Sequence, residues 1–280
     1  MNRLDTEKRT RILAALVEGN SIRATGRMVG VSKNTVTKLL AGVGAACQVY
    51  HDKAVCGLTC KRLQCDEIWA FCYSKQKNVP AGHEGEYGYG DVWTWTAIDS
   101  DTKLIASYWI GVRTPTDARE FMLDLAGRII NLAQLTTDGL GAYPDAVYEA
   151  FGSHVDYAQL IKTYSAERAG AARYSPAKCT GARKQHVISC PEPQHISTSH
   201  VERQNLTMRM SMRRFTRLTN AFSKKVENLE HAVALHFMHY NFCRKHQTLG
   251  TTPAVAAGIA DRAWTLADLI GLLEKIEDSN

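Results

Sequence analysis

The 280-residue sequence lacks any long apolar run. No stretch approaches the roughly 18 uninterrupted apolar residues of a membrane-spanning helix. The polar opening MNRLDTEKRTR also lacks the apolar segment of a signal peptide. We therefore expect a soluble, cytoplasmic protein without a membrane partner.

The sequence also lacks closely paired cysteines. Its eight cysteines are scattered along the chain, which is typical of free thiols in a reducing cytosol. Cys56 and Cys60, with Cys47 and Cys65 outside them, match no tight spacing of paired zinc ligands. We favour ordinary core cysteines over a zinc site here.

Charge is unevenly distributed along the chain. Residues 1–62 carry 11 basic and 4 acidic side chains, and residues 163–225 carry 12 and 3. The intervening residues 63–162 carry 7 basic and 14 acidic side chains. Basic blocks are the electrostatic signature of proteins that bind a phosphate backbone. The alternative is a set of solvated charged faces, which is the usual reason for charge runs.

The first basic block has the pattern of a small all-α domain. Ser21 and Ser32 each suit a helix N-cap, and Gly30 suits the turn between two short helices, the second ending at about Leu40. This order predicts a helix-turn-helix domain over residues 1–45, followed by a weakly structured linker over residues 46–62.

The exposed face of these helices is polar and basic. Its side chains carry donors that can reach phosphates and base edges in a major groove. The alternative is a helical packing module that does not bind DNA. We predict DNA contacts from Arg23, Arg27, Lys33, Asn34, Thr35, Thr37 and Lys38.

Beyond the linker the pattern changes to strands. The segments RLQCDEIWAF, VWTWTAID and KLIASYWIGV are rich in aromatic and β-branched residues. A helix from Thr116 to about Asn131 and a short strand ending at Asp138 follow. Three antiparallel strands, a helix and a further strand are the order of a ribonuclease-H-like core. The predicted fold is therefore α/β, with a ribonuclease-H-like catalytic domain over residues 63–250 and a helical tail over residues 251–280.

Three acids in this domain suit a divalent metal. Asp66 would lie on the central strand and Asp138 at the end of the strand beside it, where α/β sheets bind ligands. Glu202 opens a basic helix. Carboxylates suit Mg²⁺ or Mn²⁺, and two such ions can stabilise both oxygens of an in-line phosphoryl transfer. The predicted catalytic and metal-binding residues are Asp66, Asp138 and Glu202, with two ions expected per site.

Neighbouring residues support or compete with these roles. Side chains alternate across a strand, so Glu67 is expected behind the site in a supporting role, as are His200 and Asn205. On the basic helix, Arg209 and Arg213 are expected to project on the same side as Glu202 and to contact phosphates. A structural alternative for Glu202 is a capping box with Ser199 as N-cap.

The segment before this helix, residues 162–197, lacks clear periodicity. It contains several Gly and Pro residues and is expected to be an insertion or long loop. Its basic residues could follow a DNA backbone, and disorder is the alternative. They are Arg168, Arg173, Lys178, Arg183 and Lys184.

Long blocks of the sequence resemble a known family. They are CDEIW, GDVWTWTAID, TTDGLGAY, RYSP, HISTSHVERQNLTMRMSMRRFTRLTNAFSKK and HYNFCRKHQTLGTTPAVAAG. They are similar to bacterial insertion-sequence DDE transposases, closest to the insertion sequence one family, over essentially residues 60–260. Relatives often carry a zinc-binding cysteine cluster before the helix-turn-helix, and this chain does not.

The resemblance implies a DNA transposase with Asp66, Asp138 and Glu202 as catalytic acids. Its partners would be the terminal inverted repeats of its element and target DNA, bound by a homodimer or larger assembly at the bacterial nucleoid. Cleavage would release a 3′-hydroxyl that then joins target DNA. The alternatives are a structure-specific nuclease that needs a metal and a domesticated helix-turn-helix DNA-binding protein.

Overall fold

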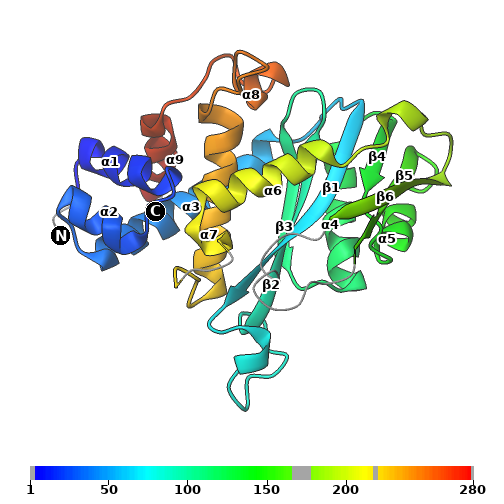
Figure 1. The fold of residues 1–280 in the computed structure, drawn as a ribbon. Coiled ribbons are helices and arrows are strands. Elements are labelled where there is room, and N and C mark those ends of the chain that lie inside the picture. Colours follow the sequence, from blue (N-terminus) through cyan, green and yellow to red (C-terminus); the bar gives the residue numbers. More distant parts are fainter. Residues whose placement is uncertain (1–3, 166–177, 217–219, 279–280) are drawn as a thin grey trace.

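A six-stranded mixed sheet forms the centre of the molecule (Figure 1). The structure is a computed structural model and describes residues 4–165, 178–216 and 220–278. The strand order is β3-β2-β1-β4-β5-β6. The strands are β1 (Arg62–Cys72), β2 (Gly90–Asp99), β3 (Ile105–Gly111), β4 (Ala133–Thr137), β5 (Val155–Tyr164) and β6 (Cys179–Ile188).

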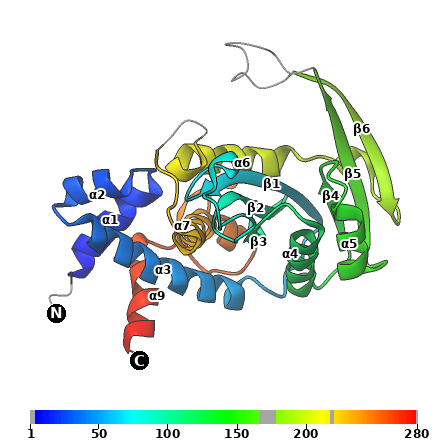
Figure 2. The same cartoon turned by 90° about the horizontal axis from the view of Figure 1, so that it is seen from below.

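Helices cover both faces of this sheet (Figure 2). They are α1 (Thr6–Val17), α2 (Ile22–Val29), α3 (Lys33–Ala54), α4 (Pro115–Arg128), α5 (Tyr143–Phe151), α6 (Ser199–Ser211), α7 (Val226–Met238), α8 (Pro253–Ala256) and α9 (Leu266–Asp278). Short helical turns are η1 (Gln76–Asn78), η3 (Pro193–His195), η4 (Arg213–Phe215) and η5 (His239–Cys243). Figure 2 shows α6 on one face and α4 and α5 on the other. Within the described residues, no helix combines the length and apolar character needed to span a bilayer.

The expected mixed α/β fold is confirmed. Strands β1, β2 and β3 pair antiparallel, whereas β4 pairs parallel with β1 and β5. Apolar side chains on the α4 and α5 side of the sheet form the core. Trp95 is fully buried there and lies against Phe121 of α4 and Tyr143 of α5.

The N-terminal helices begin at the caps that the sequence predicts. The Ser21 side chain accepts a hydrogen bond from the Ala24 amide at 3.1 Å, and Ser32 accepts one from the Thr35 amide at 3.1 Å. Gly30 ends α2 in the left-handed region with φ 70°, a conformation that glycine adopts without a Cβ clash. The turn between α2 and α3 is therefore fixed by local chemistry.

The expected end of the second helix at Leu40 is wrong. Helix α3 continues to Ala54, through about half of the segment expected to be a weakly structured linker. Its apolar stripe continues through Val43 and Cys47, both fully buried. Gly44 lies against His231 of α7, where a Cβ would come within 2.6 Å of the His231 backbone. Gly42 and Gly44 lie within this continuous helix although glycine disfavours a helix interior, and Gly44 allows close packing against α7.

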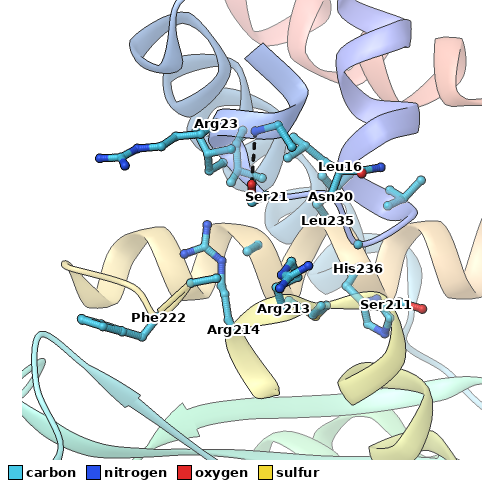
Figure 3. Close-up of a pocket in the computed structure, with 18 of the residues that line it drawn as sticks. Leu16, Asn20, Ser21, Arg23, Ser211, Arg213, Arg214, Phe222, Leu235 and His236 are labelled. Carbon is cyan, nitrogen blue, oxygen red and sulfur yellow. Dashed lines mark hydrogen bonds between the residues drawn. The ribbon is translucent and has the colours of Figure 1, made fainter. Parts of the chain in front are cut away.

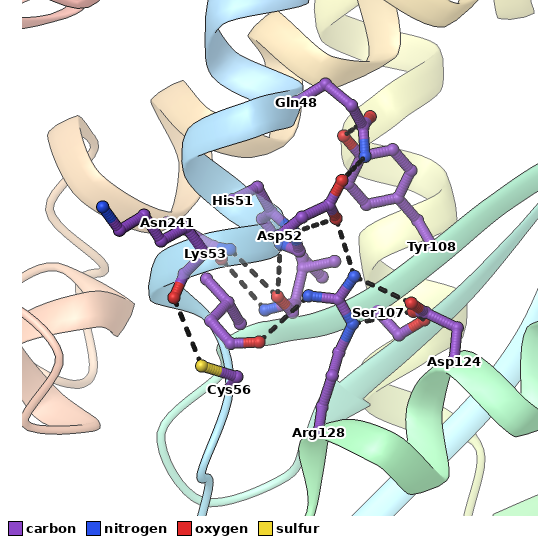
Figure 4. Close-up of polar contacts among 12 residues, drawn as sticks. Gln48, His51, Asp52, Lys53, Cys56, Ser107, Tyr108, Asp124, Arg128 and Asn241 are labelled. Carbon is purple, nitrogen blue, oxygen red and sulfur yellow. Dashed lines mark hydrogen bonds and ion pairs between the residues drawn. The ribbon is translucent and has the colours of Figure 1, made fainter.

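Polar contacts attach the second half of α3 to the sheet and α4 (Figure 4). Arg128 of α4 contacts Asp52 and Asp124 at 2.7 Å each. The Tyr108 hydroxyl on β3 donates to Gln48. The N-terminal helices are thus joined to the sheet by a packed and ion-paired helix.

The segment expected to be a loop or insertion contains part of a long β-hairpin. Residues 162–164 end β5, and residues 179–188 form the exposed edge strand β6, which extends away from the helices in Figure 2. Arg183 and Lys184 lie on β6, and Lys178 directly precedes it. Arg168 and Arg173 lie outside the described residues.

Helix α6 is shorter than expected. It ends at Ser211, and Met212 has extended backbone angles, φ −131° and ψ 105°. Arg213 therefore begins the separate turn η4. The expectation that Arg213 projects beside Glu202 on one helix face is wrong, because α6 ends before Arg213, which lines a different pocket.

Candidate functional site

Asp66 and Asp138 meet where two parallel strands separate. The recorded pairing of β1 with β4 ends at Cys65 and Thr137, and each acid is the next residue. Beyond this point β1 continues beside β2, whereas β4 ends. The sheet therefore opens beside both acids, as expected for the carboxyl edge of parallel strands.

Asp66 and the next residue face opposite sides of the sheet. The Asn205 side-chain amide on α6 donates to Asp66 Oδ2 at 2.9 Å. Glu67 faces α5, where it accepts a hydrogen bond from the Tyr143 hydroxyl at 3.0 Å. Strand alternation accounts for this division. Both acids nevertheless line the same pocket, because the open end of β4 exposes the sheet edge between them.

The pocket around these acids has a volume of about 720 Å³. One ligand oxygen from each of Asp66, Glu67 and Asp138 lies within 4.8 Å of the others. Its lining contains no cysteine or histidine among the described residues. A purely oxygen donor set suits a hard divalent cation such as Mg²⁺ or Mn²⁺.

Burial and mutual repulsion hold these carboxyls towards their neutral forms. Burial, followed by the charges of Glu67 and Asp138, raises the pKa of Asp66 to about 8. Burial also raises the pKa values of Glu67 and Asp138. Opposite charge favours an ionised carboxyl. The residues present therefore fit a site that becomes fully ionised when it receives a cation.

Glu202 lines the same pocket without joining the close group of three acids. Its carboxylate contacts the Lys162 ammonium of β5 and accepts a hydrogen bond from the Thr198 hydroxyl at 2.6 Å. Its charge is close enough to contribute to the raised pKa values of Asp66 and Asp138. The alternative capping box with Ser199 is not formed, because Ser199 is already the first helical residue and Thr198 is the N-cap.

Arg113 is a pocket residue that the sequence analysis missed. It follows β3, and its guanidinium lies 4.8 Å from the centre of the Trp93 ring. It contacts Glu67 Oε1 at 2.6 Å and lies 4.0 Å from Asp138 Oδ2. The sequence pattern that could have indicated Arg113 is an arginine between a predicted strand and a capped helix, which begins at Pro115.

Of the residues expected to support the three acids, Asn205 and Arg209 lie at the acid pocket and His200 lies outside it. Asn205 lies beside Asp66, and Arg209 lines the acid pocket. His200 lies outside the pocket lining, and its ring contacts the Lys103 ammonium at 3.3 Å. Burial and then the charge of Lys103 lower the pKa of His200. The backbone amide of His200 donates to the Gln64 side chain at 2.8 Å, and this contact helps to fix the start of α6.

The remaining expected DNA-binding residues fall into three groups. Arg23, Arg27, Lys33 and Arg213 line a second pocket, between the N-terminal helices and the end of α6. Asn34 and Lys38 are exposed on α3 outside that pocket. Thr35 and Thr37 each make a hydrogen bond within the first turn of α3.

Comparisons with known proteins agree with part of the sequence interpretation. No model of a protein family matches the chain. The Shigella dysenteriae protein described as insertion element iso-IS1n protein InsB is 24% identical over 181 residues, which are 65% of this chain and 92% of that protein. This match supports a relationship to transposases in general and does not fix a family.

One solved structure aligns with most of the chain. A piggyBac transposase in a synaptic complex with hairpin DNA aligns over 92% of this chain, with a TM-score of 0.34 and 11% identity. The chain spans 57% of the length of that protein.

Proposed function

We propose that this chain is a DDE transposase that cleaves the ends of its own insertion sequence and joins them to target DNA. The observation that carries the proposal is the meeting of Asp66 and Asp138 at the opening between β1 and β4, with Glu202 of α6 in the same pocket. The order of three antiparallel strands, α4 and a parallel fourth strand supports a ribonuclease-H-like core. The relationship to an insertion-element protein supports DNA as the substrate.

The acid pocket would hold the reacting phosphodiester. Asp66, Asp138 and Glu202 would hold divalent cations, which supply activation of the attacking hydroxyl and neutralisation of charge on the leaving oxygen. Asn205 holds the Asp66 carboxylate through one amide hydrogen. Arg113 and Arg209 line the pocket and would face the phosphate oxygens.

Glu67 has a positioning role in this proposal. Its carboxylate is already engaged by Arg113 and Tyr143, so it is less available than Asp66 and Asp138. The close group of Asp66, Glu67 and Asp138 also makes Glu67 the alternative third metal ligand. Replacement of Glu67 and Glu202 one at a time separates these two assignments.

A cleavage assay on DNA that carries the element's own ends tests the proposal. We expect Asp66→Asn, Asp138→Asn and Glu202→Gln each to abolish cleavage with Mg²⁺ or Mn²⁺ while DNA binding persists. Asp145→Asn, on the exposed side of α5, is the matched control and should keep full activity. If Glu202→Gln cleaves normally and Glu67→Gln does not, Glu67 replaces Glu202 in the triad.

A further inference from the structure

A second pocket lies between the N-terminal helices and the far end of α6 (Figure 3). Its volume is about 750 Å³. In Figure 3, Ser21 and Arg23 come from the helix on one side, and Arg213 and Arg214 come from η4 on the other. Leu40 and Leu235 contribute a buried apolar floor. We call this pocket the basic cleft.

The basic cleft carries positive charge without an acidic partner. Among its lining residues, all of them described, none is acidic. None of its cations takes part in an ion pair recorded between described residues. The six cations are Arg23, Arg27, Lys33, Arg213, Arg214 and Lys224.

Arg214 gives the strongest indication of an anionic ligand. Its guanidinium donates to the Ser223 hydroxyl. Burial lowers the pKa of Arg214, yet arginine remains protonated in proteins. Arg214 is partly buried, and withdrawing a cation from water is favourable only when a partner compensates its charge. The described residues provide no carboxylate for it, so an anion from outside the chain would complete the site.

Helix α6 connects the basic cleft to the acid pocket. Glu202, in its first turn, lines the acid pocket, and Ser211, its last residue, lines the basic cleft. Nine residues at 1.5 Å each separate them by about 14 Å along the helix. Phosphates succeed one another every 3.4 Å of axis along one DNA strand. The distance therefore corresponds to about four phosphates.

The contacts of α3 support a fixed geometry between the two pockets. Lys33, at its first turn, lines the basic cleft. The second half of the same helix is ion-paired to α4 and packed on α7 (Figure 4). The two pockets are therefore held at a fixed separation by α3 and α6.

We propose that the basic cleft binds the phosphate backbone of a DNA duplex, about four phosphates from the phosphodiester in the acid pocket of the same chain. The proposal rests on the proposed function for the identity of the duplex as the transposon end. Charge complementarity to a polyanion and the spacing of the two pockets carry it. Arg23 of α2 and Arg213 of η4 would contact the DNA phosphate backbone from opposite sides of the basic cleft.

The test measures affinity for duplex DNA over a series of salt concentrations, without divalent metal, using the full-length protein. The slope of log affinity against log salt is negative, and each lost phosphate contact makes it less steep by about 0.9. We expect the Arg23→Ala/Arg213→Ala double variant to have a slope less steep than that of the wild type by about 2. The loss should be equal for the element's end and for unrelated duplexes.

The matched control is the Lys53→Ala/Lys61→Ala double variant. Both lysines are exposed, and Lys53 lies at the opposite end of α3, about 30 Å from Lys33 by helix rise. This variant should keep the wild-type slope. An equal slope in both double variants would overturn the proposal. Because all substituted residues are exposed, thermal melting should not change.

Hydroxyl-radical footprinting on the element's end gives a second readout. Protections about four phosphates from the cleavage point should disappear in Arg23→Ala/Arg213→Ala and persist in the control. If those protections persist in both, the basic cleft does not hold this backbone. The binding assay needs no cleavage, so a protein that never joins DNA but shows the reduced slope would refute the transposase proposal and retain the basic cleft.

Discussion

The Asp66→Asn substitution should make the metal-free protein more stable at alkaline pH. Asp66 is partly buried beside two other carboxyls, and its pKa is raised from 3.8 to about 8. Between these values the folded protein holds a proton that the unfolded chain releases. The free energy of unfolding of the wild type should therefore fall as pH rises through this window. Asparagine carries no ionisable group and removes this contribution.

The expected magnitude follows from the same pKa change. Each pKa unit corresponds to about 1.4 kcal/mol. The rise from 3.8 to about 8 would therefore lower the free energy of unfolding at alkaline pH by about 6 kcal/mol if water did not reach the pocket. Asp66 is only partly buried by its accessible surface, and solvent screens its charge. We expect the free energy of unfolding of Asp66→Asn to exceed that of the wild type by about 3 kcal/mol at pH 8. This difference corresponds to a melting temperature about 6 °C higher. Near pH 4 the difference should almost vanish.

Thermal denaturation with and without divalent metal is the assay. Millimolar Mg²⁺ or Mn²⁺ should stabilise the wild type at pH 8, because ligands that bind only the folded state stabilise it. The metals should leave Asp66→Asn nearly unchanged. Asp145→Asn is the control, with wild-type behaviour in every condition. Equal melting of the wild type and Asp66→Asn at pH 8 without metal would refute the reasoning that Asp66 is a desolvated, repelled carboxyl.

Three further predictions concern helix packing, the ion pair between Arg113 and buried Glu67, and DNA recognition. Gly44→Ala should destabilise by about 1–3 kcal/mol in chemical denaturation, because its Cβ would overlap His231; Gly127→Ala, with open space on α4, should be neutral or stabilising. Arg113→Met should destabilise by about 2–3 kcal/mol by leaving buried Glu67 without its cation, and Glu67→Gln should recover part of that loss in a double-mutant cycle; additive effects would contradict the pairing. Asn34→Ala/Lys38→Ala should reduce preference for the element's end in competition binding at fixed salt, and unchanged preference would move recognition away from α3.

Local chemistry explains what the sequence could predict. The caps Ser21 and Ser32 are decided within a few residues, so the starts of α2 and α3 follow from the sequence. The meeting of Asp66 and Asp138 was predictable for a different reason. Asp66 lies within a strand-like segment and Asp138 directly follows another, and the pairing of these two parallel strands ends beside both acids. Local signals and one pairing rule were sufficient for these features.

Tertiary packing explains what the sequence could not predict. Gly42 and Gly44 favour a break on their own, but close approach to α7 keeps α3 continuous. No glycine or proline marks the end of α6 at Ser211. The Arg113 contact with Glu67 joins positions 46 residues apart. Such features depend on which surfaces meet in the folded chain.

Joining of precut DNA ends to a target tests the transposase proposal most directly. Duplexes that carry the element's end with a free 3′-hydroxyl would be incubated with plasmid, Mg²⁺ and the full-length protein. We predict covalent attachment of the ends to the plasmid by the wild type and by Asp145→Asn, and no attachment by Asp66→Asn, Asp138→Asn or Glu202→Gln. If protein that hydrolyses DNA never joins these ends, the chain is a nuclease and the transposase proposal is wrong.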